Sequence, residues 1–200
     1  MTTSPTLLAT DIRLRMTSEL SRESVEHAFR TAELARSLAE IHGVDPDRAE
    51  LAGLVHDVAD GYADVELLAM AEAYDIPISL TEARIPKLLH APVGAEVLRR
   101  DWGIDDEEIL DAVAQHITGG VRMTTLGKIL FLADKLEPER DHFYGGLVSV
   151  RKLAETNLDQ AVLQLYAWRM SQLVAGGGPV DQNLVAARNR LIDQTLAAQR

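Results

Sequence analysis

The sequence of 200 residues contains no cysteine. This absence excludes disulfide bonds, thiolate zinc sites, iron–sulfur clusters and cysteine nucleophiles together. Any metal site in the chain must therefore use histidine, carboxylate and water as ligands. Hydrophobic residues make up 46% of the chain, so we expect one compact domain with a large core.

Long apolar runs are also missing. No segment approaches the ~18 uninterrupted apolar residues that a membrane span requires. The segment MTTSPTLLATDIRLRM lacks both the basic start and the long apolar run of a secretory signal. We therefore expect a soluble, cytoplasmic protein that has no membrane partner.

Positive charge is scarce, because 20 Lys and Arg residues stand against 31 Asp and Glu residues, which gives a formal net charge of −11. Non-specific binding of duplex DNA depends on many Lys or Arg contacts to phosphate, so we do not expect duplex nucleic acid as a partner. A small anionic ligand is compatible with this composition if a metal supplies local positive charge.

Strand signals are rare, since segments of alternating β-branched residues bounded by turns are hard to find. Ala, Leu and Glu with apolar spacing of three to four residues dominate instead and predict an all-α protein. The clearest predicted helix begins near Arg22 and ends at Gly43, and Asp45-Pro46 begins the next. Further breaks are predicted at Gly61, Pro77, Pro86, Pro92, Gly103 and Gly119-Gly120.

Residues 1–20 are predicted to form an added helix, and residues 21–200 a single domain. A boundary at Glu137-Pro138 and in the stretch 141–146 precedes two predicted late helices, which the turn 176–179 separates. Apolar residues of these late helices are expected to be exposed and would then permit a homodimer, with ordinary core packing as the alternative. They are Leu163, Leu165, Tyr166 and Trp168.

Six residues carry the chemical information, and each lies in or at the end of a predicted helix: His27, His56, Asp57, His90, His116 and Asp134. Taken alone, each histidine could be a satisfied core or boundary residue. Asp134, however, follows Gly127, Leu130 and Phe131 at helical spacing, so it occupies a core position. An unpaired carboxylate there costs several kcal/mol, so we expect a cation or a dense set of hydrogen bonds around it.

Together the six residues predict a metal centre. His and carboxylate ligands suit Fe, Mn, Zn and Ni about equally, so ligand types do not identify the metal. His42, beside the helix-ending Gly43, and His142, in a polar turn, are expected to lie outside the site.

The order H…HD…H…H…D resembles the HD-domain superfamily of metal-dependent phosphohydrolases. A closer similarity, from about Glu26 to about Leu191, is to the YqeK family of symmetrical bis(5′-nucleosyl)-tetraphosphatases. Six blocks carry it: EHAFRTAELARSLAEIHGVD, RAELAGLVHDVA, LLHAPVGAEVL, GIDDEEILDAVAQHITG, LGKILFLADKLEPER and AARNRL. The resemblance implies a helical bundle that hydrolyses diadenosine tetraphosphate to two ADP, with iron as the native metal.

The resemblance also assigns roles by matching position. His27, His56, Asp57 and Asp134 would hold one metal ion, while His90 and His116 would face a second ion or the substrate phosphates. Asp57, His90 and His116 would be catalytic, with Asp57 as the bridge between two ions and His116 as the proton donor. The implied substrate-binding residues are Ser24, Asp60, Gly61, His90, His116, Thr118, Gly119, Arg140, Arg188 and Asn189.

Three positions depart from the family pattern. Asp60 stands where the family commonly has Lys, Ile117 where it often has Thr, and Ser24 where a basic residue is expected. Reduced positive charge near the phosphates leaves two alternatives open: hydrolysis of another nucleotide phosphate, and a metal-bound nucleotide sensor without turnover. A purely structural helical adaptor, in which the histidines only satisfy core contacts, is a third.

Overall fold

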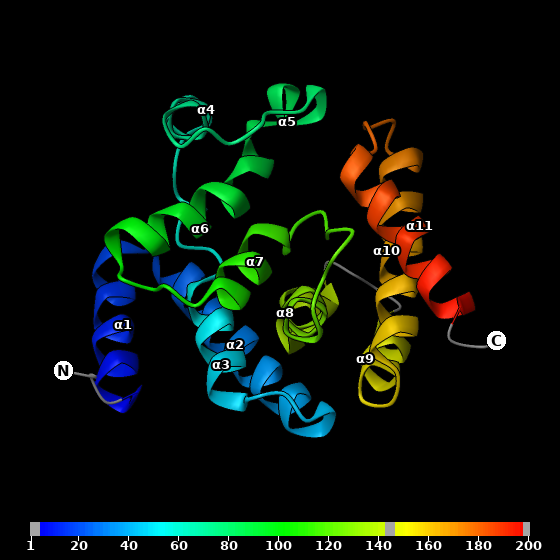
Figure 1. Cartoon of the computed structure of the whole chain (residues 1–200), viewed down its shortest axis with the longest axis horizontal. Helices are drawn as coiled ribbons and strands as arrows, with labels where there is room; N and C mark the ends of the chain where they lie inside the picture. Colours follow the sequence, from blue (N-terminus) through cyan, green and yellow to red (C-terminus); the bar gives the residue numbers. More distant parts are fainter. Residues whose placement is uncertain (1–4, 143–146, 198–200) are drawn as a thin grey trace.

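All regular secondary structure in the described part of the chain is helical (Figure 1), as the sequence predicted. The computed structural model describes residues 5–142 and 147–197, with the side chains of residues 11–140 and 147–197. The α-helices are α1 (Pro5–Glu19), α2 (Arg22–His42), α3 (Pro46–Val55), α4 (Asp64–Ala73), α5 (Leu80–Arg84), α6 (His90–Asp101), α7 (Glu107–Gln115), α8 (Thr125–Leu136), α9 (Val148–Ala154), α10 (Leu158–Ala175) and α11 (Gln182–Ala197). Two 3₁₀ turns, η1 (Pro86–Leu89) and η2 (Pro138–His142), complete the regular elements.

Local capping explains the first long helix and the one that follows it. Ser21 precedes α2, and its hydroxyl accepts a hydrogen bond from the amide of Ser24 at 3.1 Å. Gly43 ends α2 in the left-handed region, at φ 68°. The Asp45 carboxylate accepts the amide of Asp47 at 2.9 Å, directly before Pro46 begins α3. The predicted bounds of both helices are confirmed.

Two predictions about helix bounds were wrong. Pro92 does not break a helix but lies in the first turn of α6, where the missing amide hydrogen of proline would have no partner within the helix. The region after α8 contains three helices rather than two, because α9 precedes α10, whose start is capped by the side chain of Asn157. Residues 143–146 of the predicted boundary lie outside the described residues.

Helix α8 forms the centre of the fold and is drawn end-on in Figure 1. It packs against α2, α3, α7, α9 and α10. Ten of its twelve residues are buried, from Leu126 to Leu136. A helix that is apolar on nearly all sides is stable only when it is surrounded. Asp134 therefore lies in the middle of the core.

The late helices bury the apolar residues that would have served a dimer. Leu165 and Tyr166 are each 1% exposed, and Leu163 and Trp168 are partly buried against the same core. The expectation that these side chains are exposed was wrong for Leu165 and Tyr166, because α10 packs on α8, α9 and α11. They are core residues.

Helix α1 packs on the rest of the molecule through Ile12 and Met16, both buried. A separate extension that ends at residue 20 stays a prediction. Within the described residues, none of the helices combines the length and the apolar character that crossing a membrane requires.

Candidate metal centre

Five segments bring the six predicted residues together. His27 comes from α2, His56 and Asp57 from the turn after α3, His90 from the start of α6, His116 from the end of α7, and Asp134 from α8. The four histidines are at most 6% exposed and Asp134 is 2% exposed. The side chain of Asp57 keeps 15% of its surface accessible, so the cluster opens to solvent at Asp57.

Four atoms surround one point of the cluster. His27 Nε2 lies 3.2 Å from Asp134 Oδ1, and His56 Nε2 lies 3.2 Å from Asp57 Oδ2. The two remaining sides, His27 to Asp57 and His56 to Asp134, measure 3.7 Å each. Ligands about 2.0–2.2 Å from a shared ion lie roughly 3.0–3.5 Å apart, so the four atoms fit one divalent metal.

All four histidines present the same ring nitrogen to the cluster. The Nδ1 atoms of His56, His90 and His116 each donate to a backbone carbonyl three residues earlier, at 2.6–2.8 Å. His27 Nδ1 donates to the Glu137 carboxylate at 3.1 Å. Because a neutral imidazole carries one proton, each Nε2 keeps a lone pair. Four lone pairs thus face two carboxylates, which is a donor set for cations.

One of these four nitrogen atoms lacks a hydrogen-bond partner when no cation is bound. His56 Nε2 is fully buried and has no hydrogen-bond partner among the described residues. A buried lone pair without a partner costs about 1–3 kcal/mol. A metal ion bound by the four atoms would satisfy it, so the residues present fit the metal that the sequence predicted.

The pKa shifts describe the same field. Burial lowers the pKa of His56, but Asp57 and Asp134 outweigh this effect and raise it to about 10. Burial raises the pKa of Asp134, yet Lys135, His27 and His56 hold it well below its usual range. Without a metal, His56 would therefore bind a second proton, at Nε2. The core of the cluster thus attracts positive charge strongly, either this proton or a metal ion that replaces it.

A second group of three acceptors adjoins the first. Asp57 Oδ1 lies 3.3 Å from the Nε2 atoms of both His90 and His116, which lie 3.2 Å from each other. Burial lowers the pKa of His116 to about 4, so its ring is neutral near pH 7. Two facing lone pairs repel unless a cation or proton lies between them, so this group could hold a second ion with Asp57 as the bridge.

A cavity of about 820 Å³ leads to the cluster and contains His27 and Asp57. Six carboxylates and two guanidiniums, those of Arg30 and Arg140, line it. Arg140 Nη2 donates to His27 Nε2 at 3.1 Å. A polyanion entering this acidic cavity would be repelled unless metal ions reversed the local charge.

Comparison with known protein families matches residues 24–139 to the HD domain. This range begins three residues before His27 and ends just after Asp134. The chain belongs to the HD-domain family. Among its relatives, the symmetrical bis(5′-nucleosyl)-tetraphosphatase of Bacillus subtilis is 36% identical over 87% of this chain and 92% of the relative. The enzyme of the same name from Halalkalibacterium halodurans is 33% identical over 86% of this chain and 91% of the relative.

A solved structure of the HD superfamily has the same fold. It is the crystal structure of a protein from Clostridium acetobutylicum described as a predicted HD superfamily hydrolase involved in NAD metabolism. The identity is 30%, the TM-score is 0.89, and the alignment covers 93% of this chain and 97% of the other. Membership of the symmetrical tetraphosphatase family, which the sequence motifs predicted, is confirmed by the curated relatives.

Glu137 contacts this HD centre but was not among the site residues predicted from the sequence. Its side chain is 1% exposed and contacts His27, while Arg30 Nε donates to its other oxygen at 2.8 Å. Burial raises the pKa of Glu137, but the hydrogen bonds from Arg30, the Glu139 amide and His27 together outweigh burial, and the net shift is downward. Arg30 follows His27 by three residues and lies on the same helix face, a spacing that could have indicated that Arg30 is close to the centre.

The predicted substrate-binding residues divide among several places. Ser24, Asp60 and Arg140 line the cavity at the HD centre, while Thr118 and Gly119 line a second cavity described below. Gly61, Arg188 and Asn189 line neither of these two cavities, and Arg188 instead contacts Asn189 at 3.4 Å.

The charge at Asp60 is balanced by Lys87, whose Nζ lies 2.8 Å from the Asp60 carboxylate. The backbone carbonyl of Lys87 also accepts the hydrogen bond from His90 Nδ1. A lysine from another segment thus supplies positive charge beside the position where the family commonly has one. His42 lies outside the centre, as predicted, and contacts the carbonyl of Ala154 at 2.6 Å. The side chain of His142 lies outside the described residues.

Proposed function

We propose that the HD centre hydrolyses diadenosine tetraphosphate symmetrically to two ADP molecules. The main support is that four Nε2 lone pairs, the buried Asp134 and the partly exposed Asp57 converge on adjoining metal positions. The names of the relatives from Bacillus subtilis and Halalkalibacterium halodurans supply the substrate and the position of cleavage.

In the proposed reaction, water adds to one of the two inner phosphorus atoms. The bond between that phosphorus and the central bridging oxygen breaks, and the bridging oxygen leaves with the other ADP. The water oxygen and one of its protons stay on the attacked phosphorus, while the other proton goes to the bridging oxygen of the departing ADP. Either proton passes to solvent as the new terminal phosphates ionise. The chain offers no Ser or Cys nucleophile among the residues that converge on the centre.

A divalent metal ion, when bound, lowers the pKa of water and neutralises charge on the phosphoryl oxygens. His27, His56, Asp57 and Asp134 would hold the first ion, with Asp57 bridging to a second at His90 and His116. Iron is the proposed native metal, and Mn, Zn or Ni fit the same ligand types.

The proposed role of His116 follows from its hydrogen bonds. Its Nδ1 proton is committed to the carbonyl of Val113 at 2.7 Å, and its pKa is lowered to about 4. Nε2 therefore has no proton to give at neutral pH, which favours a ligand role over the proton donation predicted from the sequence. His90 has the same arrangement through Lys87.

The side chains of Arg140 and Arg30 are proposed to donate hydrogen bonds to phosphate oxygens of the substrate. Both line the acidic cavity, and Arg140 already contacts His27. A guanidinium donates two parallel hydrogen bonds to phosphate, which suits an inner phosphate of the substrate. Ser24 lines the same cavity with its hydroxyl 2.8 Å from that of Ser21.

We further propose that the protein acts in the cytoplasm, where nucleotide substrates are abundant, and that it does not bind duplex nucleic acid, because its net charge is −11. A homodimer would have to use a surface other than Leu165 and Tyr166, because both side chains are buried.

The test is product analysis. Protein loaded with iron or manganese is incubated with diadenosine tetraphosphate in ¹⁸O-labelled water, and products are separated by anion-exchange chromatography. We expect only ADP, with one labelled oxygen per two ADP molecules. Asp57→Ala should abolish turnover, whereas His42→Gln, a histidine outside the centre, should keep it.

Other outcomes distinguish the alternatives. ATP plus AMP would contradict symmetrical cleavage. Intact metal binding without turnover of this substrate would favour another nucleotide phosphate, which a panel of nucleoside mono-, di- and tetraphosphates would identify. Nucleotide binding without any product would favour the sensor.

A further inference from the structure

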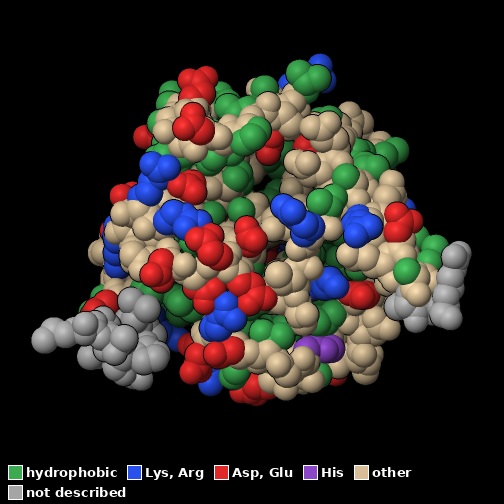
Figure 2. Space-filling model, viewed as in Figure 1, with side chains coloured by type: hydrophobic (Ala, Val, Ile, Leu, Met, Phe, Trp, Pro, Cys, Tyr) green, Lys and Arg blue, Asp and Glu red, His purple; other side chains and the backbone are tan. Residues whose placement is uncertain are grey.

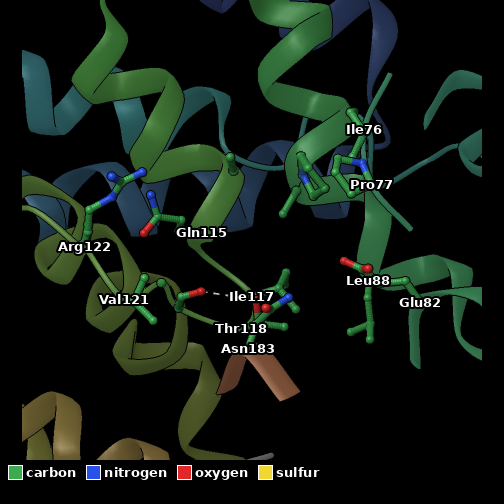
Figure 3. A pocket seen from close by; sticks show the side chains of 15 residues that line it. Ile76, Pro77, Glu82, Leu88, Gln115, Ile117, Thr118, Val121, Arg122 and Asn183 are labelled. Atoms are coloured by element: carbon green, nitrogen blue, oxygen red, sulfur yellow. Dashed lines mark hydrogen bonds between the residues drawn. The ribbon is translucent and has the colours of Figure 1, made fainter. Parts of the chain in front are cut away.

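A second cavity, of about 300 Å³, lies beside the HD centre. On the face shown in Figure 2, a hollow separates the side that carries α4 and α5 from the side that carries α10 and α11. The cavity is lined from both sides, because Glu82 comes from α5 and Asn183 from α11 (Figure 3). We call it the Glu82–Asn183 cavity.

This cavity starts where the second group of ligands ends. Leu88 and Ala91 lie on either side of His90 in the chain, and Gln115 and Ile117 lie on either side of His116; all four line the cavity. Because the Nε2 atoms of His90 and His116 are 3.2 Å apart, a molecule bound at this pair has the cavity next to it.

The lining differs from that of the acidic cavity at Asp57. Ile76, Leu88 and Ile117 provide apolar walls, and Figure 3 shows the Glu82 carboxylate directed toward the interior. Glu82 is 8% exposed, and one of its oxygens accepts the amide of Ser79 at 2.7 Å. A buried carboxylate disfavours a phosphate but accepts hydrogen bonds from an amino group.

One polar atom of the lining lacks a hydrogen-bond partner. Gln115 Oε1 is buried, and no hydrogen bond to it is found within the described residues. The cavity thus combines apolar walls with a few polar side chains, among them Glu82, Gln115 and Arg122, a lining typical of pockets for small organic ligands such as a heterocyclic ring.

One wall of the cavity lies directly against α10. Gly119 has φ 71°, and a Cβ there would come within 1.8 Å of the Tyr166 hydroxyl. Only glycine fits this close approach, so Gly119 allows this part of the lining to pack on Tyr166.

We propose that the Glu82–Asn183 cavity binds one nucleoside of the substrate, with an exocyclic amino group of its base hydrogen-bonded to Glu82. The phosphates stay at the HD centre, where cations and Arg140 receive them. This inference rests on the proposed function. The proposal also explains the apolar side chain of Ile117, which would contact the base rather than a phosphate.

Binding of a substrate analogue tests the location. The probe is diadenosine tetraphosphate with a methylene group in place of the central bridging oxygen, and the second probe is inorganic tripolyphosphate, which has no base. Both are titrated into the metal-loaded protein by calorimetry. Val121→Trp and Asn183→Trp fill the cavity from two different elements, and both positions are exposed, so folding should survive.

We expect both variants to bind the analogue at least about tenfold more weakly and tripolyphosphate within about twofold of the parent protein. Gln182→Trp, next to Asn183 but outside the lining, is the matched control and should bind both probes normally. Unchanged binding of the analogue in the two cavity variants would overturn the proposal. Because the analogue is not hydrolysed, this result is independent of whether the parent protein turns over diadenosine tetraphosphate.

A base exchange tests the contact with Glu82. The diinosine analogue has an oxygen in place of each exocyclic amino group, and we expect the parent protein to bind it at least about tenfold more weakly than the diadenosine analogue. Glu82→Gln can still accept from Ser79 and can donate to the inosine oxygen, so this preference should shrink to less than about threefold. Equal binding of the two analogues by the parent protein would contradict the assigned contact.

Discussion

Glu137 Oε1 lies 3.1 Å from Nδ1 of His27, although 110 positions of the chain separate the two residues. The carboxylate accepts the hydrogen bond from Nδ1–H and so directs the lone pair of Nε2 toward Asp134 and Asp57. Arg30 holds the other oxygen of Glu137 at 2.8 Å. A buried carboxylate of this kind orients a metal-binding imidazole and raises its basicity.

Replacing Glu137 by glutamine should therefore weaken metal binding about 10- to 100-fold. The amide keeps an acceptor for His27 but removes the charge that also holds Arg30. Calorimetric titration with Mn²⁺ measures the affinity, and circular dichroism checks that the variant is folded. Glu33→Gln, an exposed position on the same helix as His27, is the control and should bind Mn²⁺ like the parent protein. Equal affinities for Glu137→Gln and the control would show that Glu137 has no orienting role.

Two Mn²⁺ binding events of different affinity are expected, because Asp57 belongs to two adjoining groups of ligands. His90→Gln should remove the weaker event and leave the tighter one within about threefold, since His90 touches Asp57 only through Oδ1. Stoichiometry by calorimetry and elemental analysis decides. A single Mn²⁺ binding event in the parent protein, or two such events in the variant, would contradict the two-ion arrangement.

The ion pair between Asp106 and Arg48 predicts a pH dependence of stability. Arg48 donates to both Asp106 oxygens, at 2.8 and 2.6 Å, and lowers the pKa of Asp106. A carboxylate with a lowered folded-state pKa stabilises the protein above the unfolded pKa, about 3.9, and loses this contribution as the pH falls through the folded value.

Asp106→Asn keeps the cap of α7 but should lower the free energy of unfolding by about 0.5–1 kcal/mol at pH 7, because the pair is about one-third exposed. The difference should disappear as the pH falls through the lowered folded-state pKa of Asp106. Urea denaturation at several pH values measures it, with Asp105→Asn as the exposed neighbouring control. A difference that grows in acid would reverse the predicted sign.

Gly53→Ala should destabilise the protein by about 1–3 kcal/mol although alanine favours helices. A Cβ at Gly53 would lie 2.6 Å from the Cα of Ala32, so α2 and α3 would have to separate. Gly127→Ala is the matched control, since Gly127 is also buried within a helix but its Cβ would meet its nearest neighbour at 3.5 Å. Urea denaturation should show Gly127→Ala to be as stable as the parent protein or more so, and a Gly53→Ala variant of parent stability would refute the packing argument.

Local signals account for what the sequence predicted correctly. Gly43 and Asp45-Pro46 act on neighbouring backbone groups, so they predict the end of α2 and the start of α3 without knowledge of the fold. The buried position of Asp134 was visible in the spacing of its helix. The metal-ligand set depended on the order of the motifs as a whole, because each histidine alone has an ordinary interpretation.

Contacts between distant segments account for what was missed. Glu137 follows the end of α8 in an apparently polar stretch, and only the folded chain shows it against His27. Leu165 and Tyr166 looked available for a dimer because the sequence does not show that α8, α9 and α11 surround α10. The Glu82–Asn183 cavity joins α5, the loop after α7 and α11, which no local pattern relates.

The hydrogen bonds of the four histidines set an order of events during synthesis. His56, His90 and His116 take their orientation from carbonyls three residues earlier, so each can be oriented as soon as its own helical turn forms. His27 is made first but waits for Glu137. The nascent chain therefore carries an incomplete ligand set for the first ion until α8 and Glu137 have left the ribosome, so the position of that ion is completed last.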